Sequence, residues 1–145
     1  MGLRAYFYNK LVADATLNAL GFNATNIFHA QTMNGVPDAT VQHFILLAWQ
    51  DRGAAVASQR GPLRSWEQLV DVWMYDRVQD WDLITKTSQR LQEMCDEIFG
   101  VSTGASPGDG WISCVEWNGE GSDTYDEVYE ALGRYASINV VGKGN

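Results

Sequence analysis

The chain has 145 residues, of which 46% are hydrophobic and 12% aromatic, and its formal net charge at pH 7 is −8. This length suits one domain with a buried core, and the composition is too apolar for a disordered chain. The negative charge argues against a protein that binds nucleic acid by neutralising phosphates, and against one that binds anionic membrane surfaces. We therefore expect a single acidic domain over residues 1–145.

The beginning of the chain lacks the apolar segment of a signal peptide, and no stretch has the length and apolar character of a membrane span. Cys95 falls in a helical pattern and Cys114 in a strand pattern, so two buried thiols are expected and a disulfide framework is not. These features predict a protein that is made and used in a reducing cytoplasm.

The first half of the chain predicts one helix followed by three strands. Apolar residues recur at helical spacing over the first twenty residues, and Gly21 follows as a helix stop. Residues 27–33 are a weak strand candidate, and residues 34–38 form a loop. The unbroken apolar run within residues 41–50 predicts a strand that is covered on both faces.

The third strand, predicted over residues 65–77, has two unlike faces. One face carries Val70, Val72 and Met74 and should be buried. The other face mixes a carboxylate with aromatic side chains, namely Asp71, Trp73 and Tyr75. Such a mixed face suits a contact between subunits, and it suits a half-exposed sheet edge equally well.

The second half predicts a helix and two more strands. Asp80 is a good N-cap for a helix whose apolar residues recur to residue 98, and Gly100 is a natural stop. Alternating patterns predict strands over 111–117 and 134–141, and the acidic stretch between them favours turns, with one helical turn near 126–132. The order α-βββ-α-ββ predicts an α+β fold with a single, mainly antiparallel sheet and two main helices packed on it.

One short motif matches a hydrolase pattern. Residues 100–104 read Gly-Val-Ser-Thr-Gly, which fits the G-x-S-x-G nucleophile elbow. The elbow needs a strand before the serine and a helix after it, whereas here a helix precedes and a Gly/Pro loop follows. Both histidines, His29 and His43, also precede the serine, although the triad order of these enzymes places the histidine after it. We therefore expect no enzyme activity.

Metal and cofactor motifs are also missing. His29 and His43 lie in strand candidates without further ligands at metal-binding spacing, so ordinary histidines are expected. Residues 119–123 contain two glycines but lack the lysine and third glycine of a phosphate-binding loop. The sequence thus predicts no metal, no cofactor and no catalytic residue.

Opposite charges gather in two separate stretches. The long connection 51–64 is basic, with Arg52, Arg60 and Arg64, whereas residues 116–130 contain carboxylates without any lysine or arginine. The candidate acidic surface comprises Glu120, Asp123, Asp126 and Glu127. In a self-assembling ring, such patches set the choice and register of partners. Unrelated surface charge is an equally good reading.

Two segments resemble a known family. Residues 69–77, followed at once by the helix 82–98, look like part of a phage tail terminator. The pattern of residues 116–126, leading into 136–141, is similar to the same family. The element order resembles that of the wider minor tail protein U group. The resemblance covers most of the chain in element order, and in residue detail it rests on these two segments.

The resemblance implies a structural role in the virion, after assembly in the host cytoplasm. Proteins of this family form a hexameric ring that caps the head-proximal end of the tail tube, stops tube polymerisation and contacts the head-side connector, while DNA passes through the lumen without specific binding. On that basis, the candidate contacts with other subunits or with the tube protein are Arg52, Arg60, Arg64, Asp71, Trp73 and Tyr75. Some acidic side chains would line the lumen, where negative charge keeps DNA mobile.

Two other functions stay open at this point. The protein could be another head–tail neck component, such as a connector, stopper or tail completion protein. It could also be a small-ligand enzyme or binding domain with a pocket near Trp111 and Trp117, which would need a deep cleft with perturbed ionisable groups.

Overall fold

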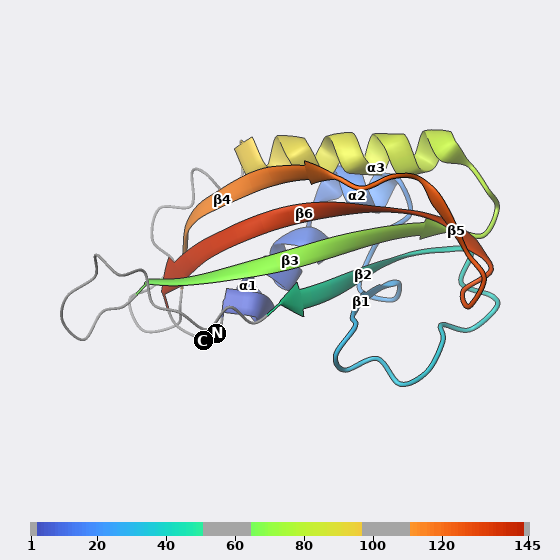
Figure 1. The fold of residues 1–145 in the computed structure, drawn as a ribbon, viewed down its shortest axis with the longest axis horizontal. Coiled ribbons are helices and arrows are strands. Elements are labelled where there is room, and N and C mark those ends of the chain that lie inside the picture. The colour runs from blue at the N-terminus through green and yellow to red at the C-terminus, as the bar shows by residue number, and fades with distance from the viewer. Residues whose placement is uncertain (1–2, 51–64, 97–110, 144–145) are drawn as a thin grey trace.

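A computed structural model describes residues 3–50, 65–96 and 111–143 of the chain. These residues form three helices and one six-stranded, mainly antiparallel sheet, which confirms the predicted α+β class (Figure 1). In chain order the elements are α1 Leu3–Val12, α2 Ala15–Ala19, β1 Ile27–His29, β2 His43–Gln50, β3 Ser65–Asp76, α3 Trp81–Met94, β4 Trp111–Glu120, β5 Thr124–Asp126 and β6 Ala131–Lys143.

The sheet is built around two long central strands. The strand order is β1-β2-β3-β6-β4, and β5 pairs with one end of β6. β3 and β6 pair antiparallel along their length, from Ser65 opposite Lys143 to Asp76 opposite Leu132. β1 pairs parallel with β2, and the other pairings are antiparallel. This long paired framework fixes which side chains share a face.

The helices lie on one face of the sheet and bury the main core against it (Figure 1). Side chains from all three helices meet the inward face of the central strands. The fully buried members include Phe7, Leu11, Leu17, Val72, Met74, Ile84, Leu91, Ile138 and Val140. Burial of this apolar surface is the main force that holds helices and sheet together.

β2 is covered on both faces, as its unbroken apolar run predicts. Ile45 and Leu47 point into the core beneath the helices. Phe44 and Leu46 belong to a second buried cluster on the opposite face, together with Tyr75 and Ala131. A strand that is buried on both sides has no polar face, which explains the absence of alternation in its sequence.

The predicted first helix is in fact two helices that are broken at Asp14. Asp14 has extended backbone angles of φ −72° and ψ 120°, and its carboxylate accepts a hydrogen bond from the Leu17 amide. This N-cap starts α2. The apolar periodicity runs through both helices, so it did not reveal the break.

The acidic turn also differs from the prediction. Residues 127–130 form a turn between β5 and β6, in place of a helical turn. The Asp126 carboxylate accepts hydrogen bonds from the Val128 and Tyr129 amides, and these bonds hold the chain in a tight reversal. As a result β6 begins at Ala131, three residues earlier than predicted.

Of two other predicted boundaries, one changes and one is confirmed. β1 ends at His29 because the Thr32 and Met33 amides both donate to the His29 carbonyl and turn the chain away. The predicted N-cap at Asp80 is confirmed, since its carboxylate accepts from the Asp82 amide at the start of α3.

Candidate functional site: an aromatic sheet face and a basic helix

The sheet face opposite the helices carries the mixed side chains of β3. Because Val70, Val72 and Met74 are buried under the helices, the alternate residues Asp71 and Trp73 point to the other side. Asp71 is half-buried there and accepts a hydrogen bond of 2.8 Å from Gln50 Nε2. The predicted face therefore exists, with a polar half near Asp71 and an aromatic half beyond Trp73.

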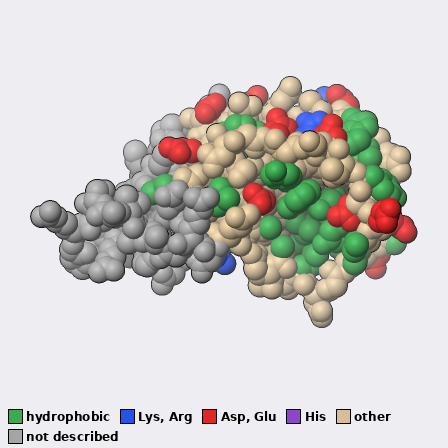
Figure 2. Space-filling view, viewed as in Figure 1, with side chains coloured by type: hydrophobic (Ala, Val, Ile, Leu, Met, Phe, Trp, Pro, Cys, Tyr) green, Lys and Arg blue, Asp and Glu red, His purple; other side chains and the backbone are tan. Residues whose placement is uncertain are grey.

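The aromatic half is a connected cluster of rings. Tyr75 stacks on Phe44 at a centroid distance of 5.0 Å, and Trp73 lies parallel to Tyr75 at 5.8 Å. Tyr135 of β6 packs against Trp73 at 4.9 Å, and Tyr129 packs against Tyr75 at 4.9 Å. Figure 2 shows hydrophobic side chains gathered on this face towards the β5 end of the sheet, with acidic side chains around them.

The six candidate contact residues differ in how a partner would reach them. Among them, Trp73 is half-buried and keeps part of its surface in solvent. Its neighbour Tyr135, which is not one of the six, is half-buried too. Tyr75 is only 4% exposed, because it lies under the neighbouring rings. Its ring therefore supports the neighbouring rings of Phe44, Trp73 and Tyr129 and leaves little surface of its own exposed. Arg52, Arg60 and Arg64 lie outside the described residues.

Tyr75 is tied to the acidic turn. Its hydroxyl donates a hydrogen bond of 3.3 Å to the Asp126 carboxylate. Burial, reinforced by the negative charge of Asp126, raises the pKa of Tyr75 far above its usual value. Tyr75 thus stays neutral, and the contact connects the aromatic face rigidly to the turn.

Two glycines make room for the rings. A Cβ on Gly133, which lies opposite Tyr75 in the sheet, would come within 2.8 Å of the Tyr75 ring. A Cβ on Gly121 would come within 1.9 Å of the Tyr135 ring, and the Gly121 amide donates to the Tyr135 carbonyl. The sequence gives no direct signal for either role, because each depends on a ring across the sheet.

Arg77 fastens the loop before β2 over the edge of this cluster. Its guanidinium lies over the Phe44 ring at 5.3 Å. The same group donates to four backbone carbonyl oxygens, those of Pro37, Asp38, Val41 and Tyr129. The Arg77 side chain therefore connects the loop before β2 to the acidic turn and fixes their relative position.

The four carboxylates of the predicted acidic surface lie in different environments. Glu120 and Asp123 both form ion pairs with Arg134 of β6. Asp126 is occupied with the turn and with Tyr75, whereas Glu127 is exposed. The local charge is therefore less negative than the sequence suggests, because Arg134 reaches the acids from another strand.

Two basic side chains that sequence analysis did not single out lie on α1, on different sides of the helix. This helix carries Arg4 and Lys10 and no acidic residue. Arg4 lies over the Trp49 ring at 5.5 Å and donates to Gln68 Oε1, and Lys10 lies over the Tyr6 ring at 5.4 Å. Within the described residues the ion pairs use Lys86, Arg90 and Arg134, and neither α1 cation takes part in them.

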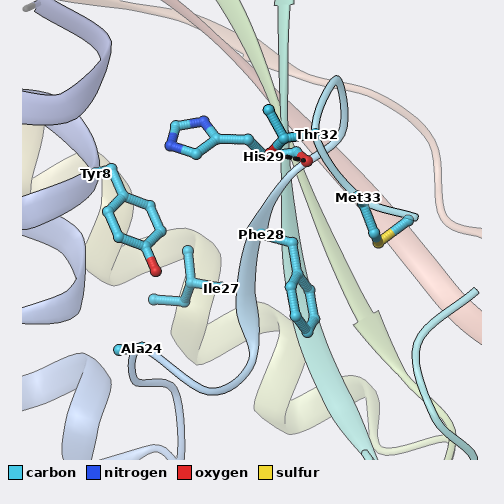
Figure 3. Close-up of a pocket in the computed structure, with 7 residues that line it drawn as sticks. All are labelled: Tyr8, Ala24, Ile27, Phe28, His29, Thr32 and Met33. Carbon is cyan, nitrogen blue, oxygen red and sulfur yellow. Dashed lines mark hydrogen bonds between the residues drawn. The ribbon is translucent and has the colours of Figure 1, made fainter. Parts of the chain in front are cut away.

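Two shallow hollows flank His29 beside α1. Figure 3 shows one of them, of about 220 Å³, with Tyr8 on one side and Phe28 and Met33 on the other. The second hollow, of about 260 Å³, is lined by Arg4, Ala5, His29, Gln31, Thr32 and Trp49. Both hollows are open at the surface, which suits contact with a protruding side chain better than enclosure of a small ligand.

Neither histidine has the surroundings of a metal ligand. His29 Nδ1 accepts a hydrogen bond from the Trp49 indole, and burial together with the nearby charge of Arg4 lowers the pKa of His29. His43 Nε2 lies 3.0 Å from the Gly21 carbonyl. The part of the chain that the structure describes contains no group of three His, Cys, Asp or Glu side chains able to hold a metal ion.

Other sequence candidates fall elsewhere. The Gly-Val-Ser-Thr-Gly motif at 100–104 lies outside the described residues. Trp117 packs against the core under the helices, so it does not line either hollow. Among the described helices, none combines the length and apolar character needed to cross a membrane.

The elements above define a two-layer α+β fold with helices on one face of a mainly antiparallel sheet. No protein-family model matches the sequence, and no curated protein matches it. The chain is similar in structure to a chain from the virion of a native gene transfer agent particle, with a TM-score of 0.68 over 99% of this chain and 96% of that chain. At 14% sequence identity, this similarity shows a common fold. A second solved chain, 13% identical over 99% of this chain and 93% of that one, has a TM-score of 0.48, too low to support an argument.

Proposed function

We propose that this protein is a structural component of a phage-like virion, and specifically a tail terminator. It would form a ring at the head-proximal end of the tail tube, stop tube polymerisation and join the tail to the head-side connector. The observation that supports this most directly is the fold shared with a gene transfer agent virion chain over nearly the whole length of both chains. The sequence resemblance to tail terminators supports the same role independently.

The aromatic sheet face gives the proposal a physical basis. Trp and Tyr side chains are enriched at protein interfaces, and contiguous apolar patches on a surface commonly mark contact sites. Here Trp73 and Tyr135 keep part of their surface exposed, on a rigid sheet supported from below by Tyr75. We assign this face to contact with a neighbouring subunit or the tube protein.

The chain's charge fits passage of DNA through a lumen. A net charge of −8 repels phosphates, so a lumen wall built from this chain would let DNA slide without binding it. The candidate lumen acids remain Glu120, Asp123, Asp126 and Glu127, with the exposed Glu127 contributing the least compensated charge. The proposed role needs no catalytic residue, metal or cofactor.

A different neck component, such as a stopper or connector, is the second candidate. Such a component would use the same fold and interface, but it would occupy a different ring between the tail tube and the head. Native mass spectrometry and electron microscopy of the purified chain, with and without tail tube protein, test the choice. A ring seated on one end of the tube supports a terminator. A ring that binds only the head-side connector favours the second candidate, and a chain that never forms an oligomer, alone or with tube protein, contradicts both.

A further inference from the structure

The flank of α1 that faces β1 carries an arginine and a tyrosine on one helical face. Arg4 and Tyr8 are four positions apart, so helix geometry makes them neighbours. Arg4 lines the larger of the two hollows beside His29, which we call the Arg4 hollow, and Tyr8 lines the other, which we call the Tyr8 hollow. His29 and Thr32 line both, so the hollows adjoin. Figure 3 shows the His29 ring projecting from β1 towards α1, and it lies 4.9 Å from the Tyr8 ring.

The guanidinium of Arg4 is held in place and still has donors to offer. Its Nε donates a hydrogen bond of 2.8 Å to Gln68 Oε1, and the group lies over the Trp49 ring at 5.5 Å. Within the residues that the structure describes, its two Nη groups have no hydrogen-bond partner. The end-on pair of Nη groups on a guanidinium forms a rigid fork that matches the two oxygens of a carboxylate. A fixed guanidinium loses little conformational entropy when it binds such a group.

Trp49 also sets the proton position on His29. Its indole N–H donates to His29 Nδ1 at 3.2 Å. Because an indole nitrogen only donates, Nδ1 must accept, and the neutral ring therefore carries its proton on Nε2. Burial and the nearby charge of Arg4 lower the pKa of His29, which favours this neutral form. Nε2 has no partner among the described residues, so it is a second free donor beside Arg4.

No carboxylate of the described chain offsets these donors. The described residues that line the two hollows include no Asp or Glu, and α1 contains none either. The hollows are therefore a local positive site on a chain whose net charge is −8. One cation beside one neutral N–H donor matches the single charge of a carboxylate better than the nearly double charge of a phosphate.

We propose that the two hollows bind a partner polypeptide through an acidic side chain and the apolar side chain next to it. The partner's carboxylate accepts hydrogen bonds from Arg4 Nη and His29 Nε2. The apolar side chain enters the Tyr8 hollow, which Ile27 and Met33 also line. A polypeptide suits this site better than a free anion, because both hollows are open at the surface and enclose little. This site does not depend on the proposed virion role.

Blocked dipeptides test the inference on the full chain. Acetyl-Leu-Glu-amide carries both groups, and acetyl-Leu-Gln-amide has the same shape without the charge. Titrations followed by NMR of the His29 ring nitrogens should show saturable binding of the Glu dipeptide, and binding of the Gln dipeptide that is about tenfold weaker or less. Acetyl-Gly-Glu-amide should bind several-fold more weakly than acetyl-Leu-Glu-amide, because it leaves the Tyr8 hollow empty.

Two variants of α1 separate the Arg4 fork from general charge. Arg4→Gln removes the guanidinium and should abolish the preference for the Glu dipeptide over the Gln dipeptide. Lys10→Gln is the matched control, because it removes one positive charge from another flank of the same helix and should leave the preference unchanged. Circular dichroism melts verify folding. The ring-nitrogen spectrum of the unaltered chain, which should show the proton of His29 on Nε2, needs no variant at all.

Several results would overturn the site. These are equal binding of the Glu and Gln dipeptides, a preference that survives Arg4→Gln, or a proton on His29 Nδ1. Acetate that binds as tightly as acetyl-Leu-Glu-amide would show a site for small anions and rule out the polypeptide. Self-association that Arg4→Gln abolishes and Lys10→Gln does not would support the site, with a second copy as the polypeptide. The dipeptide titrations involve no tail tube, so their failure leaves the proposed function standing.

Discussion

The guanidinium of Arg90 on α3 holds the Asp14 carboxylate at the break between α1 and α2. Arg90 Nη2 lies 2.6 Å from Asp14 Oδ1, and Arg90 Nε lies 3.0 Å from Oδ2, so the pair is bidentate. Both side chains are mostly buried, with 15% and 5% of their surfaces exposed. Asp14 therefore has two tasks, since it caps α2 and anchors that helix to α3.

Replacing Asp14 by Ala should lower the free energy of unfolding by about 3 kcal/mol, because the change removes a helix cap and leaves the guanidinium of a buried pair without its partner. Chemical denaturation at pH 7 measures this loss. Glu93→Ala is the matched control, because it removes only an exposed partner of the same arginine and should cost well under 1 kcal/mol. Equal losses for the two variants would contradict a structural role for the Asp14 pair.

The same pair predicts a dependence of stability on pH. Burial by itself raises the pKa of Asp14, but the hydrogen bonds from Arg90 and the Leu17 amide outweigh burial, so the pKa lies below its usual value of 3.8. A depressed pKa contributes stability at pH values above 3.8, and this contribution is lost as the pH falls through the folded-state pKa. The difference in unfolding free energy between the unaltered chain and Asp14→Asn should therefore be constant from pH 7 to 5 and narrow below pH 4. A difference that stays constant at low pH would contradict the assignment.

Gly133→Ala should destabilise the fold by about 1–3 kcal/mol, because the new methyl group would overlap the buried Tyr75 ring. Thermal melts measure the change, and Ser137→Ala on the same strand is the control, which should have little effect. In a Tyr75→Ala background the cost of Gly133→Ala should largely disappear. A cost that is the same in both backgrounds would show that the ring is not the reason for the glycine.

Trp73→Ala should reduce oligomer formation strongly and folding stability only slightly. The reason is that Trp73 is half-buried and belongs to the aromatic face that we propose as a contact. Analytical ultracentrifugation gives the assembly state, and a melt gives the stability. Trp81→Ala is the matched control, since Trp81 is an exposed tryptophan at the start of α3, away from this face. Assembly that is unchanged in Trp73→Ala would remove this face from the ring contact.

Replacing Arg52, Arg60 and Arg64 together by Ser should weaken the binding of this chain to its neighbours in the ring or to the tail tube, without unfolding the monomer. The basis is the concentration of positive charge in the connection 51–64 of an otherwise acidic chain. Tail length distributions and virion yield measure docking in an assembly system. Normal tails and intact virions from this triple variant would contradict the role given to the loop.

Local patterns in the sequence decided the fold class and most of the secondary structure. The two-faced alternation of β3, the N-cap at Asp80 and the double-sided burial of β2 all follow from side-chain spacing within one element. The acidic character, the aromatic content and the candidate face of Asp71, Trp73 and Tyr75 also came from the sequence alone. These features need only the order of neighbouring residues.

The tertiary structure decided everything that depends on distant partners. The break at Asp14 is anchored by Arg90, which lies 76 positions away, and Arg134 neutralises Glu120 and Asp123 across a strand. The hydrogen bond between Tyr75 and Asp126 is recognisable only once the pairing of β5 with β6 is known. Periodicity reports which side of an element is apolar, but it does not report which residue from elsewhere meets it, because that is set by packing across the whole fold.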